Sequence, residues 1–219
     1  MPPRQRALAG LSALLTDMPW TLRAGDLDRL AAAGLGDEAI VQAVTISAVF
    51  NYLARIADGT GIDFDYESPL PRIVIDRDRP ASPRAAREDW PAPNPAPKRS
   101  LSLRPMTAGA MGALRAYVYE RDAPLSLRER ALLGRTAALA LCDGPGSLAF
   151  AADEPAGARE ACLAAYADRL TRTPWKVGEA DLNELRAHGL DDRGLLDVIS
   201  IVAAQNAFSR VRLALEAPA

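Results

Sequence analysis

The chain has 219 residues, of which 49% are hydrophobic and 25% are charged, and its formal net charge is −2. This size and apolar content allow one large hydrophobic core or two small ones. The balance of charges excludes a generally basic surface for nucleic acid, and no apolar run approaches the roughly 20 residues that span a bilayer. The two cysteines, Cys142 and Cys162, make neither a disulfide framework nor a metal cluster. We therefore expect a cytoplasmic protein with no cofactor and no nucleic-acid or membrane partner.

One stretch of the sequence occurs twice, at an offset of 155 positions. The segments that match without a gap are Leu15-Thr16-x-x-Pro19-Trp20 with Leu170-Thr171-x-x-Pro174-Trp175, Gly34-Leu35-x-Asp37 with Gly189-Leu190-x-Asp192, and Asn51-x-x-x-Arg55 with Asn206-x-x-x-Arg210. Ungapped self-similarity over about 40 residues is typical of a structural repeat. The sequence therefore predicts a duplicated helical unit.

The spacing of apolar residues predicts an all-α fold of about eight helices. We expect helices over residues 7–16, 24–33, 37–58, 107–121, 126–142, 156–171 and 192–215, with the short helix of the second repeat before the last of these. Pro19 and Gly34 separate the first three helices, because proline cannot continue a helix and glycine adopts the left-handed conformation that ends one. Ser126 and Glu129 form a capping box at the start of another helix.

Nine of the 17 prolines lie between Tyr66 and Pro105. So many prolines favour extended backbone, and we interpret this segment as a strap over the surface, with Trp90 as its anchor and with Ile73-Val74-Ile75 as a candidate short strand. The sequence thus divides into a partial helical repeat at 1–66, a proline-rich strap at 67–105 and a full helical unit at 106–219. We expect the two helical parts to pack as one domain.

Three features resemble the carboxymuconolactone decarboxylase superfamily, in its alkylhydroperoxidase-D-like, peroxidase-related branch. They are the Tyr166-Ala-x-x-Leu170-Thr171-x-x-Pro174 run, the Leu-x-x-x-Gly-Leu-x-Asp link at 185–192 and 30–37, and the Asn-x-x-x-Arg pair of the long helix. The resemblance covers most of 107–216 and, in part, 8–66. It implies a duplicated alkylhydroperoxidase-like bundle and a homo-oligomer, a trimer or a hexamer.

Redox members of that family carry a Glu about a dozen residues before a C-x-x-C-x-x-x-H run at the start of a helix. There the helix lowers the pKa of the first thiol, the second cysteine resolves the oxidised form, and Glu and His relay protons. If Cys142 takes the first cysteine position, the second is Pro145, the histidine is Ala149, and the relay position falls on Arg130, next to Glu129. If Glu129 is aligned instead, the cysteine positions become Leu141 and Gly144. A two-thiol peroxidase cycle is therefore not expected.

The candidate residues leave several interpretations open. Cys142, Glu129 and Arg130 are the candidate catalytic residues. The alternative interpretations are that Cys142 is a small buried residue at a helix end and that Glu129 is a helix cap. Cys162 reads as a core thiol and His188, the only histidine, as a helix-end surface residue. The two Asn–Arg pairs either satisfy buried arginines or line a pocket for an anionic substrate; these pairs are Asn51 with Arg55 and Asn206 with Arg210.

Three functions follow from the resemblance and from the incomplete motif. The first is a divergent family member that has lost the two-cysteine centre and acts on another small molecule. The second is a non-catalytic oligomeric scaffold or the partner of an active paralogue. The third is a residual activity, either a one-thiol peroxidase through Cys142 or a decarboxylase-like lyase.

Overall fold

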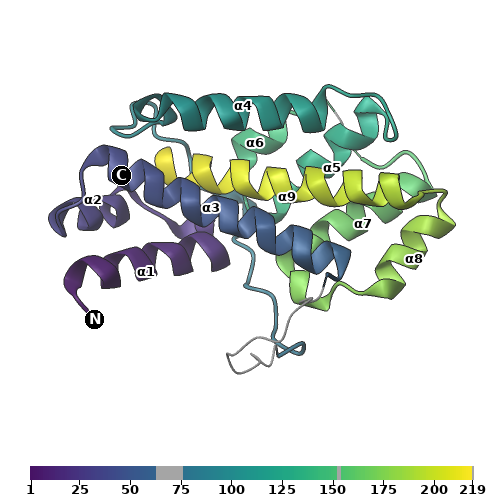
Figure 1. Ribbon diagram of the computed structural model, residues 1–219, viewed down its shortest axis with the longest axis horizontal. Coiled ribbons are helices and arrows are strands. Elements are labelled where there is room, and N and C mark those ends of the chain that lie inside the picture. Colours follow the sequence, from purple (N-terminus) through teal and green to yellow (C-terminus); the bar gives the residue numbers. More distant parts are fainter. Residues whose placement is uncertain (63–75, 152–153, 219) are drawn as a thin grey trace.

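The computed structural model describes residues 1–62, 76–151 and 154–218, and within these ranges the protein is all-α, as predicted. The described helices are α1 (Pro3–Asp17), α2 (Ala24–Ala32), α3 (Asp37–Thr60), α4 (Pro105–Tyr119), α5 (Leu127–Ala140), α6 (Gly144–Leu148), α7 (Ala158–Arg172), α8 (Glu179–Ala187) and α9 (Asp192–Leu215) (Figure 1). Short 3-10 turns lie at Pro19–Thr21, Arg87–Asp89, Leu101–Leu103 and Pro174–Lys176.

The elements of residues 3–60 recur, with the same bounds, 155 positions later. We call residues 3–60 the first unit and residues 158–215 the second unit; α1, α2 and α3 correspond to α7, α8 and α9, and the turn after α1 corresponds to the turn after α7. Gly34 and Gly189 follow α2 and α8 with φ of 87° and 83°, a left-handed conformation that glycine adopts without strain. Helices α4, α5 and α6 precede the second unit, and no counterpart of them packs on the first unit among the described residues.

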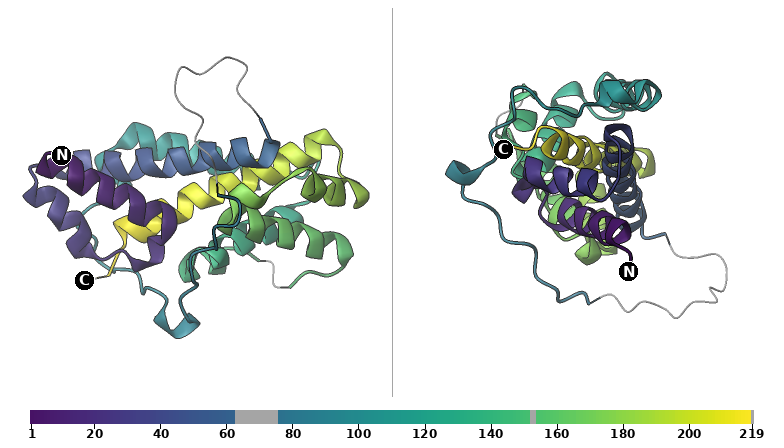
Figure 2. Two further views of the ribbon diagram at one scale, coloured as in Figure 1. Left: turned by 90° about the horizontal axis from the view of Figure 1, so that it is seen from below. Right: turned by 90° about the vertical axis from the view of Figure 1, so that its left-hand side faces the viewer.

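The two long helices pack against each other at the centre of the protein. Helix α9 is enclosed on nearly all sides, with α3 on one side and α5 and α7 on the other (Figure 2). Ala207 and Val211 of α9 join the apolar cluster built by α1, α2 and α3, while Tyr52 and Ile56 of α3 pack on the cluster of the second unit. The two units therefore share their central contacts.

Local signals explain most helix boundaries. Helix α5 begins with the expected capping box, in which Ser126 Oγ accepts from the Glu129 N–H at 3.2 Å and the Glu129 carboxylate accepts from the Ser126 N–H at 2.8 Å. The Asp143-Gly-Pro-Gly146 segment carries the start of the short helix α6. Asp143 caps it by accepting from the Gly146 N–H at 3.0 Å, and proline fits the first turn of a helix because that turn needs no amide donor.

Residues 76–104 of the strap contact both units. Arg99 is buried and forms ion pairs with Asp37 and Asp28, which attaches the strap to the first unit. Trp90 packs on the apolar cluster around Cys142, and the Trp175 indole N–H donates to the Arg79 carbonyl at 3.2 Å. The candidate strand Ile73-Val74-Ile75 lies outside the described residues.

Candidate functional site

The residues expected to form a thiol site do not come together. Glu129 and Arg130 lie in the first turn of α5, whereas Cys142 lies beyond its last residue. A helix of 14 residues is about 20 Å long at a rise of 1.5 Å per residue. Glu129 and Arg130 therefore cannot relay protons to the sulfur of Cys142.

Arg130 ties the start of α5 to its neighbours. Its side chain is 1% exposed and forms an ion pair with Asp197 of α9. The guanidinium also donates to three backbone carbonyls, those of Leu125, Val118 and Ala123, at 3.1, 2.9 and 3.0 Å. With an ion pair and three carbonyl acceptors, this buried arginine is satisfied by the fold itself.

Glu129 is likewise occupied by structural contacts. One carboxylate oxygen caps α5, and the other accepts from Arg159 Nε at 2.7 Å. Burial raises the pKa of Glu129, but the hydrogen bonds from Arg159 and Ser126 outweigh burial, so the net pKa is lowered. A carboxylate with a lowered pKa and two fixed partners is a poor proton relay at neutral pH.

Cys142 is enclosed in an apolar cluster. It is fully buried with Trp20, Leu141 and Leu213, and Ala85 and Trp90 of the strap pack on the same cluster. Burial raises the pKa of the thiol despite a hydrogen bond from the Ala85 backbone and the charges of Arg84 and Arg172. The thiolate is the nucleophile in cysteine chemistry, so this environment opposes reactivity.

The remaining sequence candidates also have structural positions. Cys162 is buried in the core of the second unit, and burial together with Glu184 and Asp181 raises its pKa. His188 ends α8, and its backbone carbonyl accepts from Arg159 Nη1 at 2.6 Å. These contacts agree with a core thiol and a helix-end histidine.

The two Asn–Arg pairs form one network that links the units. Within each long helix the asparagine carbonyl oxygen accepts from the arginine four residues later, at 2.8 Å for Asn51 with Arg55 and 2.6 Å for Asn206 with Arg210. The asparagine amides donate to the hydroxyl groups of Thr16 in α1 and Thr171 in α7, at 3.0 and 2.9 Å. The same hydrogen bonds therefore occur 155 positions apart.

Each arginine also reaches the opposite unit. Arg55 Nη2 donates to the carbonyl of Thr171 at 3.3 Å, and Arg210 donates to the carbonyls of Leu15 and Thr16 at 2.8 and 3.1 Å. The carbonyls involved are those at the ends of α7 and α1, which have no acceptor role inside their own helices. The exchange is reciprocal, and it places the two guanidinium groups near each other at the centre of the protein.

Neither guanidinium has a carboxylate at ion-pair distance among the residues that the structure describes. Arg55 and Arg210 are 5% and 1% exposed. Burial lowers the pKa of Arg55 to about 10, against a partial compensation from Asp58 and Asp17. Burial also lowers the pKa of Arg210 well below its usual value, and the charge of Arg55 lowers it further.

Both arginines line a pocket of about 220 Å³, which we call the central pocket. Its walls come from both units, from the strap and from the end of α5. They are formed by Thr16, Asp17, Trp20, Ala54, Arg55, Asp58, Arg79, Ser82, Ala140, Leu141, Thr171, Arg172, Pro174, Trp175 and Arg210.

The lining of the central pocket is only partly reciprocal. Threonine, tryptophan and arginine occur at matching positions of the two units, as Thr16 with Thr171, Trp20 with Trp175 and Arg55 with Arg210. The acidic residues have no acidic counterpart, because Asp17 corresponds to Arg172 and Asp58 to Leu213. The repeated motif thus supplies Arg55 and Arg210, and the two carboxylates of the pocket lie at positions where the units differ.

Asp58 is the carboxylate of the pocket without an ion pair at 4.0 Å or less within the described ranges. Burial raises its pKa, and the charges of Arg55 and Arg77 offset only part of that effect. Asp17, in contrast, pairs with Arg79 at 3.2 Å. A half-buried carboxyl with a raised pKa beside cationic groups is a group that can give or accept a proton.

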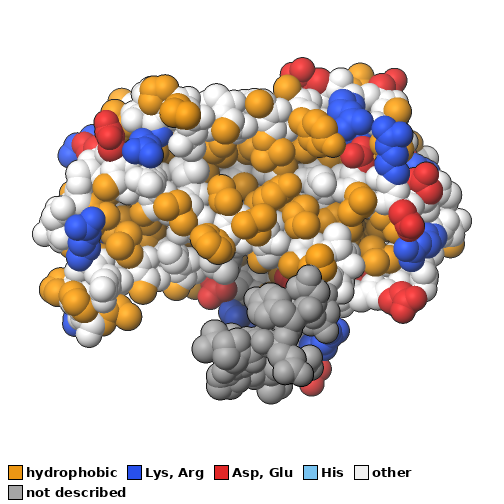
Figure 3. Space-filling model, in the orientation of Figure 1, with side chains coloured by type: hydrophobic (Ala, Val, Ile, Leu, Met, Phe, Trp, Pro, Cys, Tyr) orange, Lys and Arg blue, Asp and Glu red, His pale blue; other side chains and the backbone are white. Residues whose placement is uncertain are grey.

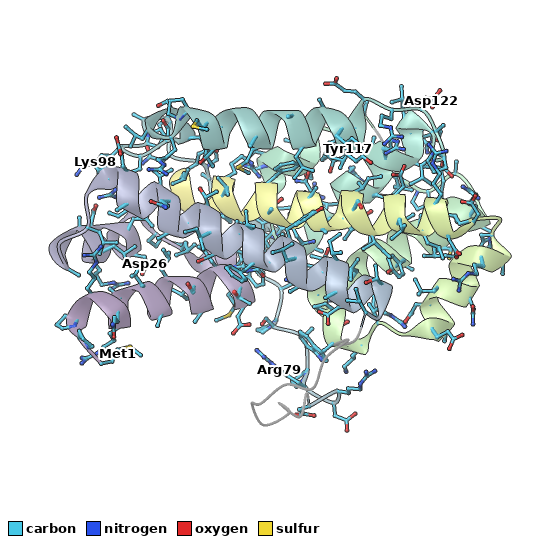
Figure 4. The ribbon with its side chains drawn as sticks, viewed as in Figure 1. Met1, Asp26, Arg79, Lys98, Tyr117 and Asp122 are labelled. Atoms are coloured by element: carbon cyan, nitrogen blue, oxygen red, sulfur yellow. The ribbon has the colours of Figure 1, made fainter. Side chains whose placement is uncertain are left out.

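The strap forms one edge of the central pocket. Arg79, labelled on the strap in Figure 4, lies over the ring of Trp175 with 5.4 Å from its guanidinium carbon to the ring centroid. With its ion pair to Asp17, Arg79 therefore connects both units at the edge of the pocket. Ser82 contributes a second strap residue.

The sequence indicated the arginines of this site but not its other residues. Trp20 and Trp175 belong to the repeated motif and could have been selected as a matched aromatic pair. Asp17 and Asp58 could have been found as charged departures from the repeat at positions close to repeated residues. Among described residues, no group of three or more His, Cys, Asp or Glu side chains could hold a metal ion.

A second pocket of about 390 Å³ lies between α4, the end of α9 and the strap, and its lining is mainly apolar.

Comparisons of the chain with protein-family models, with curated proteins and with solved structures find no match in any of the three.

Proposed function

We propose that the protein is a divergent alkylhydroperoxidase-like family member that binds a small organic anion in the central pocket and acts on it by proton transfer. The observation that carries the proposal is the pair of buried guanidinium groups, Arg55 and Arg210, which face one pocket without a carboxylate at ion-pair distance among the described residues. The duplicated helical unit is, in this proposal, the frame that brings both arginines to one place.

An anion is the ligand that such a pocket favours. Burial disfavours the charged form of both guanidinium groups and lowers the pKa of each, and the charge of Arg55 lowers the pKa of Arg210 further. A carboxylate placed between them would stabilise both charged forms. Among the described residues Arg55 Nε has no hydrogen-bond partner, whereas the matching atom of Arg210 donates to the Leu15 carbonyl, so Arg55 retains an unused donor. A planar guanidinium binds carboxylates through paired hydrogen bonds.

The pocket also limits the size and shape of the ligand. Its volume of about 220 Å³ is smaller than the 300–1,000 Å³ that is usual for drug-sized ligands. Trp20 and Trp175 add flat apolar surface from the two units. We therefore infer a small carboxylate with an apolar or unsaturated body, held by its acid group against the arginines.

Asp58 supplies the proton-transfer group. Its raised pKa keeps a larger fraction protonated near neutral pH than for an ordinary aspartate, and the arginines stabilise negative charge that develops on the ligand. The thiol of Cys142 takes no part, because it is buried behind Leu141 and Trp20 rather than exposed in the pocket.

Intrinsic fluorescence tests the binding step, since two of the three tryptophans line the pocket. The probes are acetate, benzoate, succinate and inorganic phosphate at constant ionic strength. We expect a saturable change with at least one carboxylate in the wild type and at least a tenfold weaker affinity in Arg55→Gln, with circular dichroism to establish folding.

Arg186→Gln is the matched control, because Arg186 is a surface arginine of α8 outside the pocket. It should bind as the wild type does. A wild type that responds to none of the four probes, or an Arg55→Gln variant that is folded and binds equally well, would contradict the proposal.

The scaffold alternative has one observation in its favour, an uncovered apolar surface on α3. It predicts a folded protein that assembles but shows no saturable response to carboxylates. The fluorescence titration therefore separates the two functions directly.

A further inference from the structure

The outer side of α3 is an exposed apolar stripe. Ile46, Val49, Phe50 and Leu53 are 48%, 45%, 66% and 50% exposed. Their spacing places all four on one side of the helix, and the sequence from Ala39 to Ala54 contains no charged residue. Figure 3 shows apolar side chains gathered across the middle of this side of the molecule, with charged side chains mainly towards its edges.

In the second unit, the positions that match Ile46, Val49 and Phe50 are buried. The counterparts of Ile46 and Val49 in α9 are Ile201 and Ala204, and both are 0% exposed. The counterpart of Phe50 is Gln205, which is 2% exposed and accepts from the Tyr119 hydroxyl of α4 at 2.9 Å. Helices α4 and α5 make this cover. The first unit lacks such helices, so its long helix presents the uncovered side.

Helix α4 has an apolar outer side of its own. Met106 is 91% exposed and Tyr117 is 55% exposed, and Gly109, Ala110 and Ala113 are exposed between them. Arg115 is the only charged residue of this helix. Helices α3 and α4 flank α9 on one side of the protein (Figures 1 and 2). Tyr52 of α3 lies near Tyr117 of α4: burial raises the pKa of Tyr52, and Tyr117 raises it further.

Two occupants could cover this face, a lipid bilayer or another protein. By length and composition, α3 and α9 could each cross a membrane, although 83% of the α9 window is buried inside the protein. A helix that binds a membrane surface is usually flanked by Lys and Arg, which attract anionic lipids. Helix α3 begins instead with Asp37 and Glu38, and the chain carries a net charge of −2. The charges therefore favour a protein.

We propose that a second copy of this chain covers the face, with α4 of each protomer packed on the α3 stripe of the other. Within the chain α4 already packs by its inner side on α9, the counterpart of α3. A two-fold arrangement is self-complementary and closed, so it buries both stripes and leaves neither exposed.

The flat area of the face is smaller than one side of a standard stable interface, so the proposed dimer also needs contact area from protruding side chains. Two adjacent helices about 10 Å wide and 25–30 Å long present on the order of 500–600 Å² before side-chain relief is counted. A standard stable interface buries about 800 Å² per partner. Apolar side chains such as Phe50 and Met106 protrude and add to the contact area.

Light scattering coupled to size exclusion tests the proposal on the full chain. We expect the wild type at micromolar concentration to have twice the 23.4 kDa chain mass. Phe50→Glu should be a monomer with at least a hundredfold weaker association. Because Phe50 is 66% exposed, the variant should fold. Leu148→Glu, which changes an 82% exposed residue on α6, is the matched control and should remain dimeric.

A compensating variant tests the pairing of helices. Phe50→Glu combined with Ala113→Lys places opposite charges on α3 and on α4, and it should regain dimer at low salt if α4 of one copy covers α3 of the other. A monomeric wild type, a dimeric Phe50→Glu variant, or no recovery in the double variant would overturn the proposal. Binding of a monomeric wild type to vesicles of anionic phospholipid would instead assign the face to a membrane.

Discussion

The long helices α3 and α9 share a motif and a length but differ in their surroundings. Each has 24 residues, and each carries an asparagine and an arginine that make the same hydrogen bonds. Yet α9 is enclosed, whereas α3 exposes four large apolar residues on one side. The difference arises from α4 and α5, which cover α9 and have no counterpart on α3 in the part of the chain that the structure describes. A repeated motif therefore fixes the internal contacts of a unit but not its environment.

The largest expected difference between α9 and α3 comes from placing a carboxylate at matching positions of the two helices. Ala204→Glu buries a carboxylate without a partner on α9, and we expect a loss of about 3–5 kcal/mol of unfolding free energy. Val49→Glu, at the matching exposed position of α3, should change the monomer by less than about 0.5 kcal/mol. Urea denaturation at a concentration that keeps both variants monomeric measures both values. Equal losses would show that the two sides are covered alike.

Removing either asparagine should lower the unfolding free energy by an intermediate amount. Asn51→Ala and Asn206→Ala each remove an acceptor from a buried guanidinium and a donor to a threonine. Loss of such a buried partner costs about 1–3 kcal/mol, and we expect the two losses to agree within about 0.5 kcal/mol. Thermal unfolding of both variants tests this. A large difference would mean that the two networks are not equivalent in energy.

Asp58 is a carboxylate of the central pocket, and the matching residue of the second unit is Leu213. Its pKa is raised in the folded protein, so its charged form opposes folding and this cost develops as pH rises through the folded pKa. Asp58→Asn should therefore stabilise the protein at pH 7 by about 1 kcal/mol or less, and the gain should vanish below the unfolded pKa of about 3.9. Unfolding measured from pH 3 to pH 8 checks it, and a gain that grows at low pH would contradict the sign.

The same protonation should affect ligand binding. As pH falls and Asp58 is protonated, a negative charge leaves the pocket, so carboxylate affinity should rise until the ligand itself is protonated. The Asp58→Asn variant should lose most of this pH dependence. Fluorescence titration at several pH values compares the two proteins.

The smallest effect is expected at Cys142, a thiol that lies between α5 and α6, outside both units. Because it is buried with a raised pKa, peroxide turnover with a dithiol reductant should be the same for the wild type and for Cys142→Ala. A rate that falls at least tenfold in the variant would restore the one-thiol peroxidase hypothesis.

Much of the fold could be predicted from local patterns. The capping box of Ser126 and Glu129 and the glycine ends of α2 and α8 depend on residues within a few positions of each other. The thiol site could not be judged in this way. The resemblance made Cys142 and Glu129 candidates for one catalytic site, although each fitted the motif only in a different register. A helix of fixed rise separates the two residues, and their actual partners, Trp20, Trp90 and Arg159, are distant in sequence.

By itself, the sequence determined the helices and the Asn–Arg spacing of each long helix, because a separation of four residues places two side chains on one side of any α-helix. Only the tertiary structure decided that Arg55 and Arg210 cross to the opposite units, that Asp58 joins them in the central pocket, and that α9 is covered while α3 is not. The physical reason is that burial, and with it pKa and hydrogen bonding, depends on elements brought together from distant parts of the chain.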